Sequence, residues 1–224
     1  MIEYSETLAK KYNSYHAREK HLEDLQIKKI ATYLKYWENT SIIDIGCGSG
    51  RLLTKLGEYF NVIYGVEKSK EMFDCIPISE LKNTAIFSYS LHQIGKTKEE
   101  QIDLLYKTFS KFGCKKILLI TSSRSQFKES FLNTNIPSIQ EIDLQRFLFK
   151  DELEKYFNIE LYEEETNCQR IPTVDYIEMI QNKYISTLKL IKDVEIEEFL
   201  KSLEGTSEVL ISDYYTYITL ELNK

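Results

Sequence analysis

The stretch Ile42–Gly50 (IIDIGCGSG) constrains the fold of this chain more than any other. It is a short apolar run that ends in an acidic residue and continues with glycines at alternate positions, which is typical of a buried strand that enters a tight turn. Glycine lets the backbone take positive φ and lets a ligand approach closely, because it has no Cβ atom. Arg51–Phe60 then has apolar residues at helical spacing and no proline. The order of strand, glycine turn and helix predicts the start of a nucleotide-type site in a doubly wound sheet.

The spacing of the glycines narrows the choice of ligand. A dinucleotide fingerprint has the form G-x-G-x-x-G, in which the third glycine lets the helix pack closely on the strand. Here the third glycine, Gly50, comes one position early, and Arg51 holds the fingerprint position. NAD and FAD are therefore disfavoured. The sequence has no G-x-x-x-x-G-K-[ST] motif either, which excludes a P-loop. The alternative is a glycine-rich turn that binds no ligand.

A second acidic residue ends the next predicted strand. Val62–Glu67 (VIYGVE) is another short strand, and Glu67 lies about twenty positions after the glycines, where folds of this kind place a carboxylate that accepts hydrogen bonds from the ribose hydroxyls. Asp44 and Glu67 would together flank the ligand. Two carboxylates repel a pyrophosphate but attract a sulfonium and an ammonium group. The pair therefore predicts an adenosine-like ligand with a cationic tail.

The segment from Ile42 to Phe73 resembles the first two motifs of the class I S-adenosylmethionine-dependent methyltransferases, and most of all their small-molecule, type-11-like branch. The resemblance implies transfer of a methyl group from S-adenosylmethionine to an oxygen, nitrogen or sulfur atom of a small molecule, with S-adenosylhomocysteine as product. It places a polar residue, Lys68, after the ribose ligand, and Met72 near the adenine. The motif positions are Asp44, Gly46, Gly48, Gly50, Glu67, Lys68 and Met72.

Predicted strands alternate with helices along the rest of the chain, which implies a mostly parallel, Rossmann-like doubly wound α/β sheet. The expected strands are Thr84–Leu91, Lys116–Thr121, Ile159–Glu165 and Asp213–Leu222, and the expected helices are Lys98–Phe112, with Gly113 as C-cap, and Lys150–Phe157. A third strand around Cys75–Ile78 is very short or missing. The resemblance implies that the last strand is antiparallel to its neighbours.

We expect a single domain, 1–224, with four parts. They are an N-terminal helical lid implied by the resemblance (1–40), a cofactor-binding core (41–166), a helical insert on the substrate side (167–210) and a final strand (211–224). The insert contains two helical patterns, Val174–Tyr184 and Glu195–Leu203.

Ligands of open α/β sheets bind beyond the carboxyl ends of the strands, so the tip of the Thr84–Leu91 strand is expected to face the methyl group. Ser90 is a candidate cofactor contact there. His92 is either a general base or a residue that caps the strand. Tyr12 in the lid is a further cofactor candidate, and Cys47 in the glycine loop is either a reactive thiol or, as we favour, a small residue that fits the turn.

The candidate substrate contacts come from the lid and from the region of the insert. Tyrosines and a histidine of the lid can contact the substrate or anchor the helix on the sheet. Arginines suit an acidic substrate, because a guanidinium binds a carboxylate with two hydrogen bonds, although structural salt bridges are the commoner outcome. An aromatic residue of the insert can line the pocket or belong to the core. The candidates are Tyr15, His16, Arg146, Arg170 and Tyr176.

Composition excludes several classes of function. The chain has 224 residues and a formal net charge of −6, which argues against broad nucleic-acid binding. Four scattered cysteines and three histidines show no metal-ligand spacing, and the cysteine pattern indicates a reduced, cytoplasmic protein. No apolar run is long enough to span a membrane, and the N-terminus lacks the apolar core of a signal peptide.

Three functions stay open beside a small-molecule methyltransferase. The first is a protein of the same fold that binds S-adenosylmethionine or S-adenosylhomocysteine without turnover. The second is a methyltransferase that acts on protein or RNA. The third, a nicotinamide oxidoreductase, is disfavoured by the glycine spacing. The sequence leaves the oligomeric state open.

Overall fold

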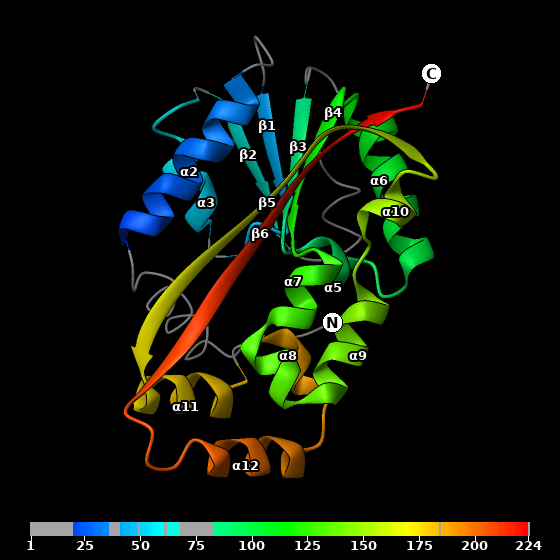
Figure 1. Cartoon of the computed structure of the whole chain (residues 1–224). Helices are drawn as coiled ribbons and strands as arrows, with labels where there is room; N and C mark the ends of the chain where they lie inside the picture. The colour runs from blue at the N-terminus through cyan, green and yellow to red at the C-terminus, as the bar shows by residue number, and fades with distance from the viewer. Residues whose placement is uncertain are drawn as a thin grey trace.

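The computed structural model describes residues 20–35, 41–48, 50–60, 62–67, 83–183 and 185–223. Its described strands form one six-stranded sheet in the order β2-β1-β3-β4-β6-β5. The first four strands in this order are parallel, and β6 is antiparallel to both of its neighbours (Figure 1). The expected fold class and the antiparallel last strand are therefore confirmed. The strands are β1 (Ser41–Ile45), β2 (Ile63–Val66), β3 (Asn83–Ser88), β4 (Lys116–Thr121), β5 (Phe157–Pro172) and β6 (Glu208–Leu222).

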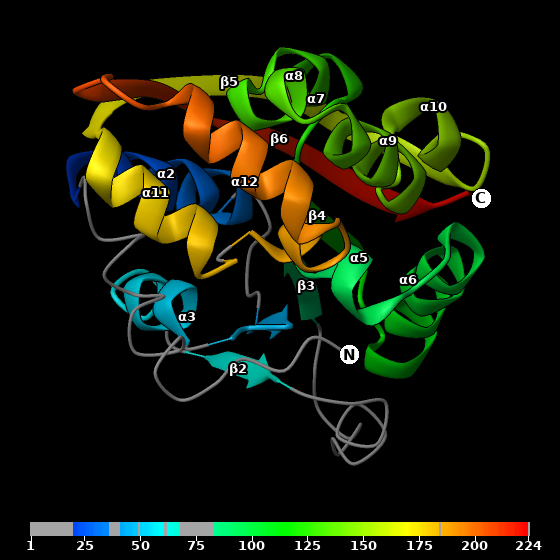
Figure 2. The ribbon, with the colours of Figure 1, turned by 90° about the horizontal axis from the view of Figure 1, so that it is seen from below.

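Helices cover both faces of the sheet and the end toward which β1, β2 and β3 point (Figure 1). The described helices are α2 (Lys20–Lys35), α3 (Arg51–Leu56), α5 (Leu91–Ile94), α6 (Lys98–Phe112), α7 (Arg124–Glu129), α8 (Phe131–Asn135), α9 (Pro137–Arg146), α10 (Lys150–Leu153), α11 (Thr173–Gln181), the 3-10 helix η2 (Ser186–Lys189) and α12 (Asp193–Ser202). Seen from below, α11 and α12 lie across this end of the molecule (Figure 2).

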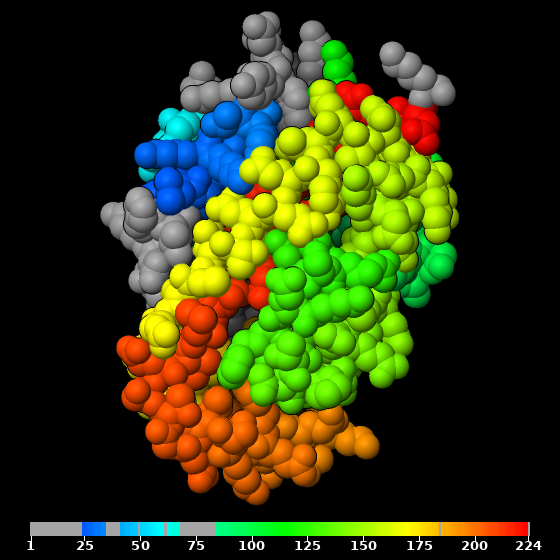
Figure 3. Space-filling model, in the orientation of Figure 1, coloured from blue at the N-terminus to red at the C-terminus, as the bar shows by residue number. Residues whose placement is uncertain are grey.

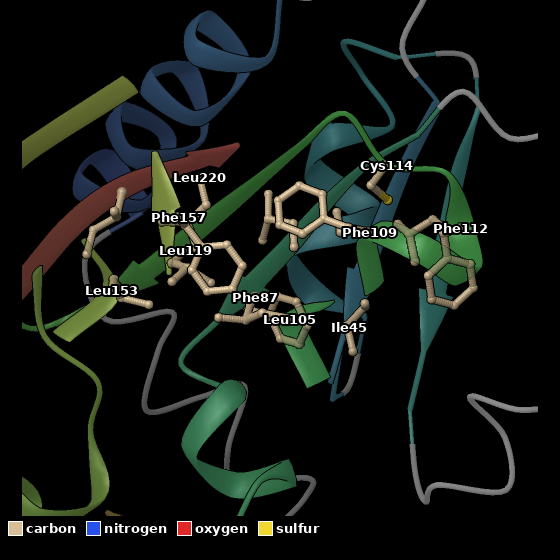
Figure 4. Close-up of a cluster of buried hydrophobic side chains, with 14 of the residues drawn as sticks. Ile45, Phe87, Leu105, Phe109, Phe112, Cys114, Leu119, Leu153, Phe157 and Leu220 are labelled. Carbon is tan, nitrogen blue, oxygen red and sulfur yellow. The ribbon is translucent and has the colours of Figure 1, made fainter. Parts of the chain in front are cut away.

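Alternation of side chains along β4 divides the core into two layers. Ile117 and Leu119 face α6 and α10, where they pack with Phe109 and Phe157 (Figure 4). Leu118 and Ile120 point to the other face and pack with α2 and α3. Successive residues of a strand point to opposite faces, so an apolar run such as KILLIT suits a strand that is buried on both sides. Each fully buried side chain of this kind stabilises the fold by about 1.5–3 kcal/mol.

The boundaries of α6 agree with the predicted helix Lys98–Phe112. Thr97 caps the first turn, because its side chain accepts a hydrogen bond from the backbone N–H of Glu100 at 3.2 Å. Gly113 ends the helix with φ of 61°, the left-handed conformation that favours glycine. Both ends are therefore set by local residues.

β5 and β6 are longer than predicted. The strand expected over Ile159–Glu165 begins at Phe157 and continues to Pro172, and β6 begins at Glu208 rather than Asp213. Beyond the main sheet the two strands pair only with each other, and their side chains are mostly half-buried or exposed, so the alternation of apolar residues that marks a buried strand is missing there. We call this two-stranded extension, residues 164–172 and 208–215, the arm.

The arm crosses the face shown in Figure 3 between α2 and the helices α7, α8 and α9. Lys29 of α2 fixes its start, since its Nζ lies 2.6 Å from Glu163 Oε1 and 2.7 Å from Glu165 Oε2. The arm leads into α11, η2 and α12, which return the chain to β6. These helices share a separate apolar cluster with α8 and α9, centred on Ile139, Ile180 and Leu188.

The two helices predicted within the insert are found, with shifted ends. The structure has α11 at Thr173–Gln181 and α12 at Asp193–Ser202. The strand predicted over Thr84–Leu91 ends earlier than expected, at Ser88, because Tyr89 takes positive φ. The helix expected over Lys150–Phe157 ends at Leu153, and Phe157 already belongs to β5.

Candidate functional site

The glycine loop joins β1 to α3 at the carboxyl end of β1. Gly46, Gly48 and Gly50 have φ of 79°, 55° and 76°, so all three take the left-handed conformation that the sequence predicts. A hydrogen bond fixes the loop to β2, since the N–H of Gly46 donates to the carbonyl of Val66 at 2.7 Å. α3 begins directly after it, with the N–H of Thr54 donating to the Gly50 carbonyl at 2.9 Å.

The glycines of the loop differ in what surrounds them. A Cβ atom at Gly46 would overlap the side chain of Ser90, so the close packing of the β3 tip requires glycine there. Cβ atoms at Gly48 and Gly50 would meet no described atom within 4 Å. Among the described residues, the outer part of the loop is therefore uncovered, and its inner part is closed by Ser90.

Asp44 and Glu67 lie at this loop, as predicted, and have different surroundings. Asp44 is 1% exposed, and its Oδ1 has no hydrogen-bond partner among the residues that the structure describes. Glu67 is exposed, and its Oε2 accepts the N–H of Gly48 at 2.7 Å. Burial and then the charge of Glu67 raise the pKa of Asp44 to about 7, while Arg51 opposes the shift. A buried carboxyl without a donor is costly, which is the arrangement expected where a ligand supplies the missing partner.

Cys47 and Ser90 complete the loop. Cys47 is half-buried over β2, and its Sγ lies 2.9 Å from where a Cβ atom of Gly65 would be. Burial, followed by the charges of Asp44 and Glu67, raises the pKa of the Cys47 thiol to about 11, so the thiol is protonated at neutral pH. This favours the interpretation of Cys47 as a small residue that fits the turn. Ser90 is buried, and its hydroxyl donates to the carbonyl of Ile45.

His92, the predicted general base, lies in α5 and is buried. Its ring stacks on Phe147 with centroids 3.9 Å apart and an interplanar angle of 25°. Burial and then the charge of Arg146 lower the pKa of His92 to about 3, so its imidazole is neutral and a weak base. Both rings line a small cavity of about 20 Å³ beyond β3, together with Tyr89 and Ser90. A catalytic role for His92 stays a prediction.

The substrate candidates in and before the insert do not come together in one place. Arg146 donates from Nη1 to the hydroxyl of Thr187 at 3.3 Å, in a network that also contains Asp143. Tyr176 is buried in the core of the insert, with its ring centroid 6.0 Å from that of Phe131. Arg170 is exposed on the arm. Arg146 and Tyr176 thus have partners within the protein, and substrate contacts of Arg146, Arg170 and Tyr176 stay predictions.

Some predicted residues are not covered by the described part of the chain. Tyr12, Tyr15, His16, Lys68 and Met72 lie outside the described residues, as do the short third strand around residues 75–78 and Tyr184 at the predicted end of a helix. Their assigned roles stay predictions.

The sequence did not indicate two features near the carboxyl end of β4. Tyr89 has φ of 50° and packs with the aromatic cluster Phe127, Phe147 and Phe149. A second cavity, of about 70 Å³, lies beside this cluster, between α7, α10 and β6. Both cations that line the cavity are paired, because Arg124 Nη2 lies 3.2 Å from Asp151 Oδ1 and Lys150 Nζ lies 3.6 Å from Glu154 Oε1. No turn-forming residue type marks position 89, so no sequence signal was available.

Within the described ranges, no group of three or more histidine, cysteine, aspartate or glutamate side chains is placed to hold a metal ion. In the same part of the chain, no helix is both long and apolar enough to cross a membrane.

No protein-family model and no curated protein matches the sequence. Solved structures do match the fold. Two are named as putative methyltransferases: one from Bacillus halodurans, at 11% identity and a TM-score of 0.52, and one from an antibiotic biosynthesis pathway of Anabaena variabilis, at 16% identity and a TM-score of 0.52. Each match covers 88% of this chain and 97% of the other. The YcgJ protein from Bacillus subtilis matches at 12% identity and a TM-score of 0.50, over 91% of this chain and 100% of that one.

Identities this low establish the fold and leave the activity open. The resemblance seen in the motifs is therefore confirmed at the level of architecture, and the chain has the Rossmann-like fold of these proteins, two of which bear a methyltransferase name.

Proposed function

We propose that this protein is an S-adenosylmethionine-dependent methyltransferase that acts on an oxygen, nitrogen or sulfur atom of a small molecule. The observation that supports the proposal most strongly is the arrangement of groups at the carboxyl end of β1. There a left-handed glycine loop, open at Gly48 and Gly50, adjoins a buried carboxyl of Asp44 that lacks a donor. The fold of the matching structures supports it.

The charges at the loop favour this cofactor over a dinucleotide. Asp44 and Glu67 both place carboxyl groups near the loop, and Asp44 is sensitive to the charge of Glu67. A pyrophosphate in this position would meet the negative Glu67 and further oppose the ionisation of Asp44, whereas an ammonium or sulfonium group would be attracted and would favour that ionisation. Gly48 already donates its N–H to Glu67, so this amide is not available to a phosphate oxygen in the described conformation.

In this proposal the cofactor supplies an activated methyl group for in-line displacement, and the chain supplies alignment. The glycine loop and the two carboxylates hold the cofactor at the carboxyl end of the sheet. Ser90 supports the loop from the side of β3. The helices α11 and α12 lie across this end (Figure 2). In this proposal they cover the acceptor and exclude water. The neutral His92 takes no proton at pH 7 in this scheme.

Calorimetric titration with S-adenosylmethionine and S-adenosylhomocysteine, with NAD as control, tests the proposal. We expect micromolar binding of the sulfur ligands and none of NAD. Gly48→Arg fills the open face of the loop and is expected to abolish binding. Gly205→Arg is a matched control, because Gly205 also has positive φ, of 81°, and open space around it, but lies in the turn between α12 and β6. Failure of the wild-type protein to bind either sulfur ligand, or equal binding by both variants, would contradict the proposal.

A second candidate is a protein that binds the cofactor without turnover. The polar groups at the tip of β3 favour it, because they are engaged within the protein: the Ser90 hydroxyl donates to Ile45, and His92 is stacked on Phe147. Incubation of the protein with methyl-labelled S-adenosylmethionine and a small-molecule extract separates the two functions. Labelled small-molecule product supports the enzyme, and binding without any labelled product supports the second candidate.

A further inference from the structure

Tyr89 takes an unusual backbone conformation directly after β3. Its φ of 50° is one of only two positive values at non-glycine residues in the described part of the chain; the other is at Lys183. A bulky aromatic residue rarely adopts this conformation, since its Cβ crowds the following carbonyl group. The strain has to be opposed by contacts elsewhere, and such residues concentrate at functional sites.

The hydroxyl group of Tyr89 supplies those contacts. It is buried and lies within hydrogen-bond reach of the carbonyl groups of Thr121, at 3.1 Å, and of Tyr214. The hydroxyl of Ser122 is 3.5 Å away. Thr121 ends β4 and Tyr214 belongs to β6, so one side chain joins the tip of β3 to its neighbour β4 and to β6, the next strand beyond β4. Burial raises the pKa of Tyr89 well above its ordinary value, which keeps the hydroxyl protonated as a donor.

Ser90, the next residue, links the tip of β3 to the glycine loop. Ser90 donates its hydroxyl to the carbonyl of Ile45 and occupies the space that a side chain at Gly46 would need. Ser90 also starts α5, because its carbonyl accepts the N–H groups of Gln93 at 2.9 Å and Ile94 at 3.1 Å. The direction of the Ser90 side chain therefore depends on the conformation of residue 89.

We infer that Tyr89 is a positioning residue for the cofactor loop: its hydroxyl holds residue 89 in the left-handed conformation, and this conformation holds Ser90 against Gly46. The inference rests on the proposed function, since it concerns the loop assigned to S-adenosylmethionine. Tyr89 itself touches the strands β4 and β6 and acts on the loop only through Ser90.

The competing view makes Tyr89 an ordinary core residue. It packs edge-on against Tyr215 with ring centroids 6.3 Å apart, and it joins the cluster of Phe127, Phe147 and Phe149. In that view any substitution affects ligand binding only as far as it lowers stability. The two views therefore differ in whether binding follows stability across a set of variants.

Three variants of the full chain separate the views. Tyr89→Phe keeps the ring but removes the hydroxyl that opposes the strain. Tyr89→Asn removes the ring but tolerates the left-handed conformation. Ile117→Val is the control for stability, because Ile117 is buried at the amino end of β4, and the loss of one methylene-sized group there matches the loss of one hydroxyl. Thermal unfolding and calorimetric titration with S-adenosylhomocysteine are measured for each.

We expect Tyr89→Phe to bind S-adenosylhomocysteine about tenfold more weakly than wild type, which is the effect of losing one buried hydrogen bond. Ile117→Val should bind like wild type at a similar unfolding temperature. Tyr89→Asn should unfold at the lowest temperature and yet bind more tightly than Tyr89→Phe.

Wild-type affinity in Tyr89→Phe, or affinities that follow unfolding temperature through all three variants, would overturn the inference. If Tyr89→Asn does not fold, the comparison of Tyr89→Phe with Ile117→Val decides alone. If wild-type protein binds neither S-adenosylmethionine nor S-adenosylhomocysteine, the proposed function fails and the inference fails with it, which is distinct from loss of the Tyr89 effect alone.

Discussion

The glycine loop and the helical region around α9 each contain a buried aspartate, and the two differ in their partners. Asp143 of α9 accepts hydrogen bonds from Asn133 Nδ2 at 3.3 Å and from Thr187 Oγ1 at 2.6 Å, and it lies in the field of Arg146. Asp44 has an Oδ1 without a donor in the described residues, and the nearest charge that raises its pKa is another carboxylate.

We propose that this difference separates a structural carboxylate from a ligand-binding one. Buried polar groups in folded proteins are normally hydrogen-bonded, so a network that is satisfied within the chain stabilises the fold. The Oδ1 atom of Asp44 is the unpartnered carboxyl oxygen among the buried side-chain atoms that the structure describes. Asp143 ties α8, α9 and η2 together, whereas Asp44 lies beside an open loop.

Asp44→Asn is expected to stabilise the free protein at pH 8. The folded-state pKa of Asp44 is about 7 against an ordinary 3.8, so the folded state binds more protons in this range and stability falls as pH rises from about 4 to about 7. This change of the pKa from 3.8 to about 7 corresponds to at most ~4 kcal/mol of unfolding free energy. Urea unfolding at pH 5 and pH 8 checks this: the variant should gain more stability at pH 8 than at pH 5, where only about a third of the effect is present. An equal effect at both pH values would contradict it.

Asp143→Ala is expected to destabilise the protein by about 3 kcal/mol, because it leaves buried donors of Asn133 and Thr187 without an acceptor. The sign is opposite to that of Asp44→Asn at pH 8. Urea unfolding at pH 7 measures the loss. A stabilising effect of Asp143→Ala would remove the contrast between the two aspartates.

Gly46→Ala is expected to cost more than Gly205→Ala. Both glycines have positive φ, and the backbone strain of alanine there costs about 1–2 kcal/mol at either position. Only the alanine at position 46 adds a clash, because its Cβ atom would overlap the side chain of Ser90. Thermal unfolding of the two variants isolates the effect of the clash. Equal unfolding temperatures would show that Ser90 moves away freely and does not fix the loop.

The smallest effect concerns the rates at which cysteines of the loop and of the arm react with iodoacetamide. Cys47 is half-buried with a pKa of about 11, whereas Cys168 is exposed on the arm. Only the thiolate reacts with iodoacetamide, so we expect Cys168 to be labelled at least about tenfold faster at pH 7.5. Peptide mapping by mass spectrometry gives both rates. Faster labelling of Cys47 would favour the interpretation of Cys47 as a reactive thiol.

Where local residues determine structure, the sequence predicted it. The bounds of β4 and α6 and the left-handed glycine loop follow from an apolar run, from the caps Thr97 and Gly113, and from glycine spacing. α7 and α9 were missed although each carried a signal: Ser123 and Gln126 form a capping box, and Pro137 occupies the first turn of α9.

Other features depend on contacts between distant segments, which a single sequence does not show. The outer arm is held by pairing between β5 and β6, as in Arg170 opposite Leu210. The conformation of Tyr89 depends on carbonyl groups of β4 and β6. The sequence placed Asp44 at the loop, but only the structure shows that its carboxyl lacks a donor.

The most direct test of the central claim is calorimetric titration of Asp44→Asn and Asp143→Asn with S-adenosylhomocysteine, beside wild-type protein. If the unpartnered carboxyl belongs to the cofactor site and the partnered one to the fold, Asp44→Asn should lose at least about tenfold in affinity, as expected for removal of one charged contact, while Asp143→Asn stays within about twofold of wild type. Wild-type affinity in Asp44→Asn, or an equal loss in both variants, would contradict the account.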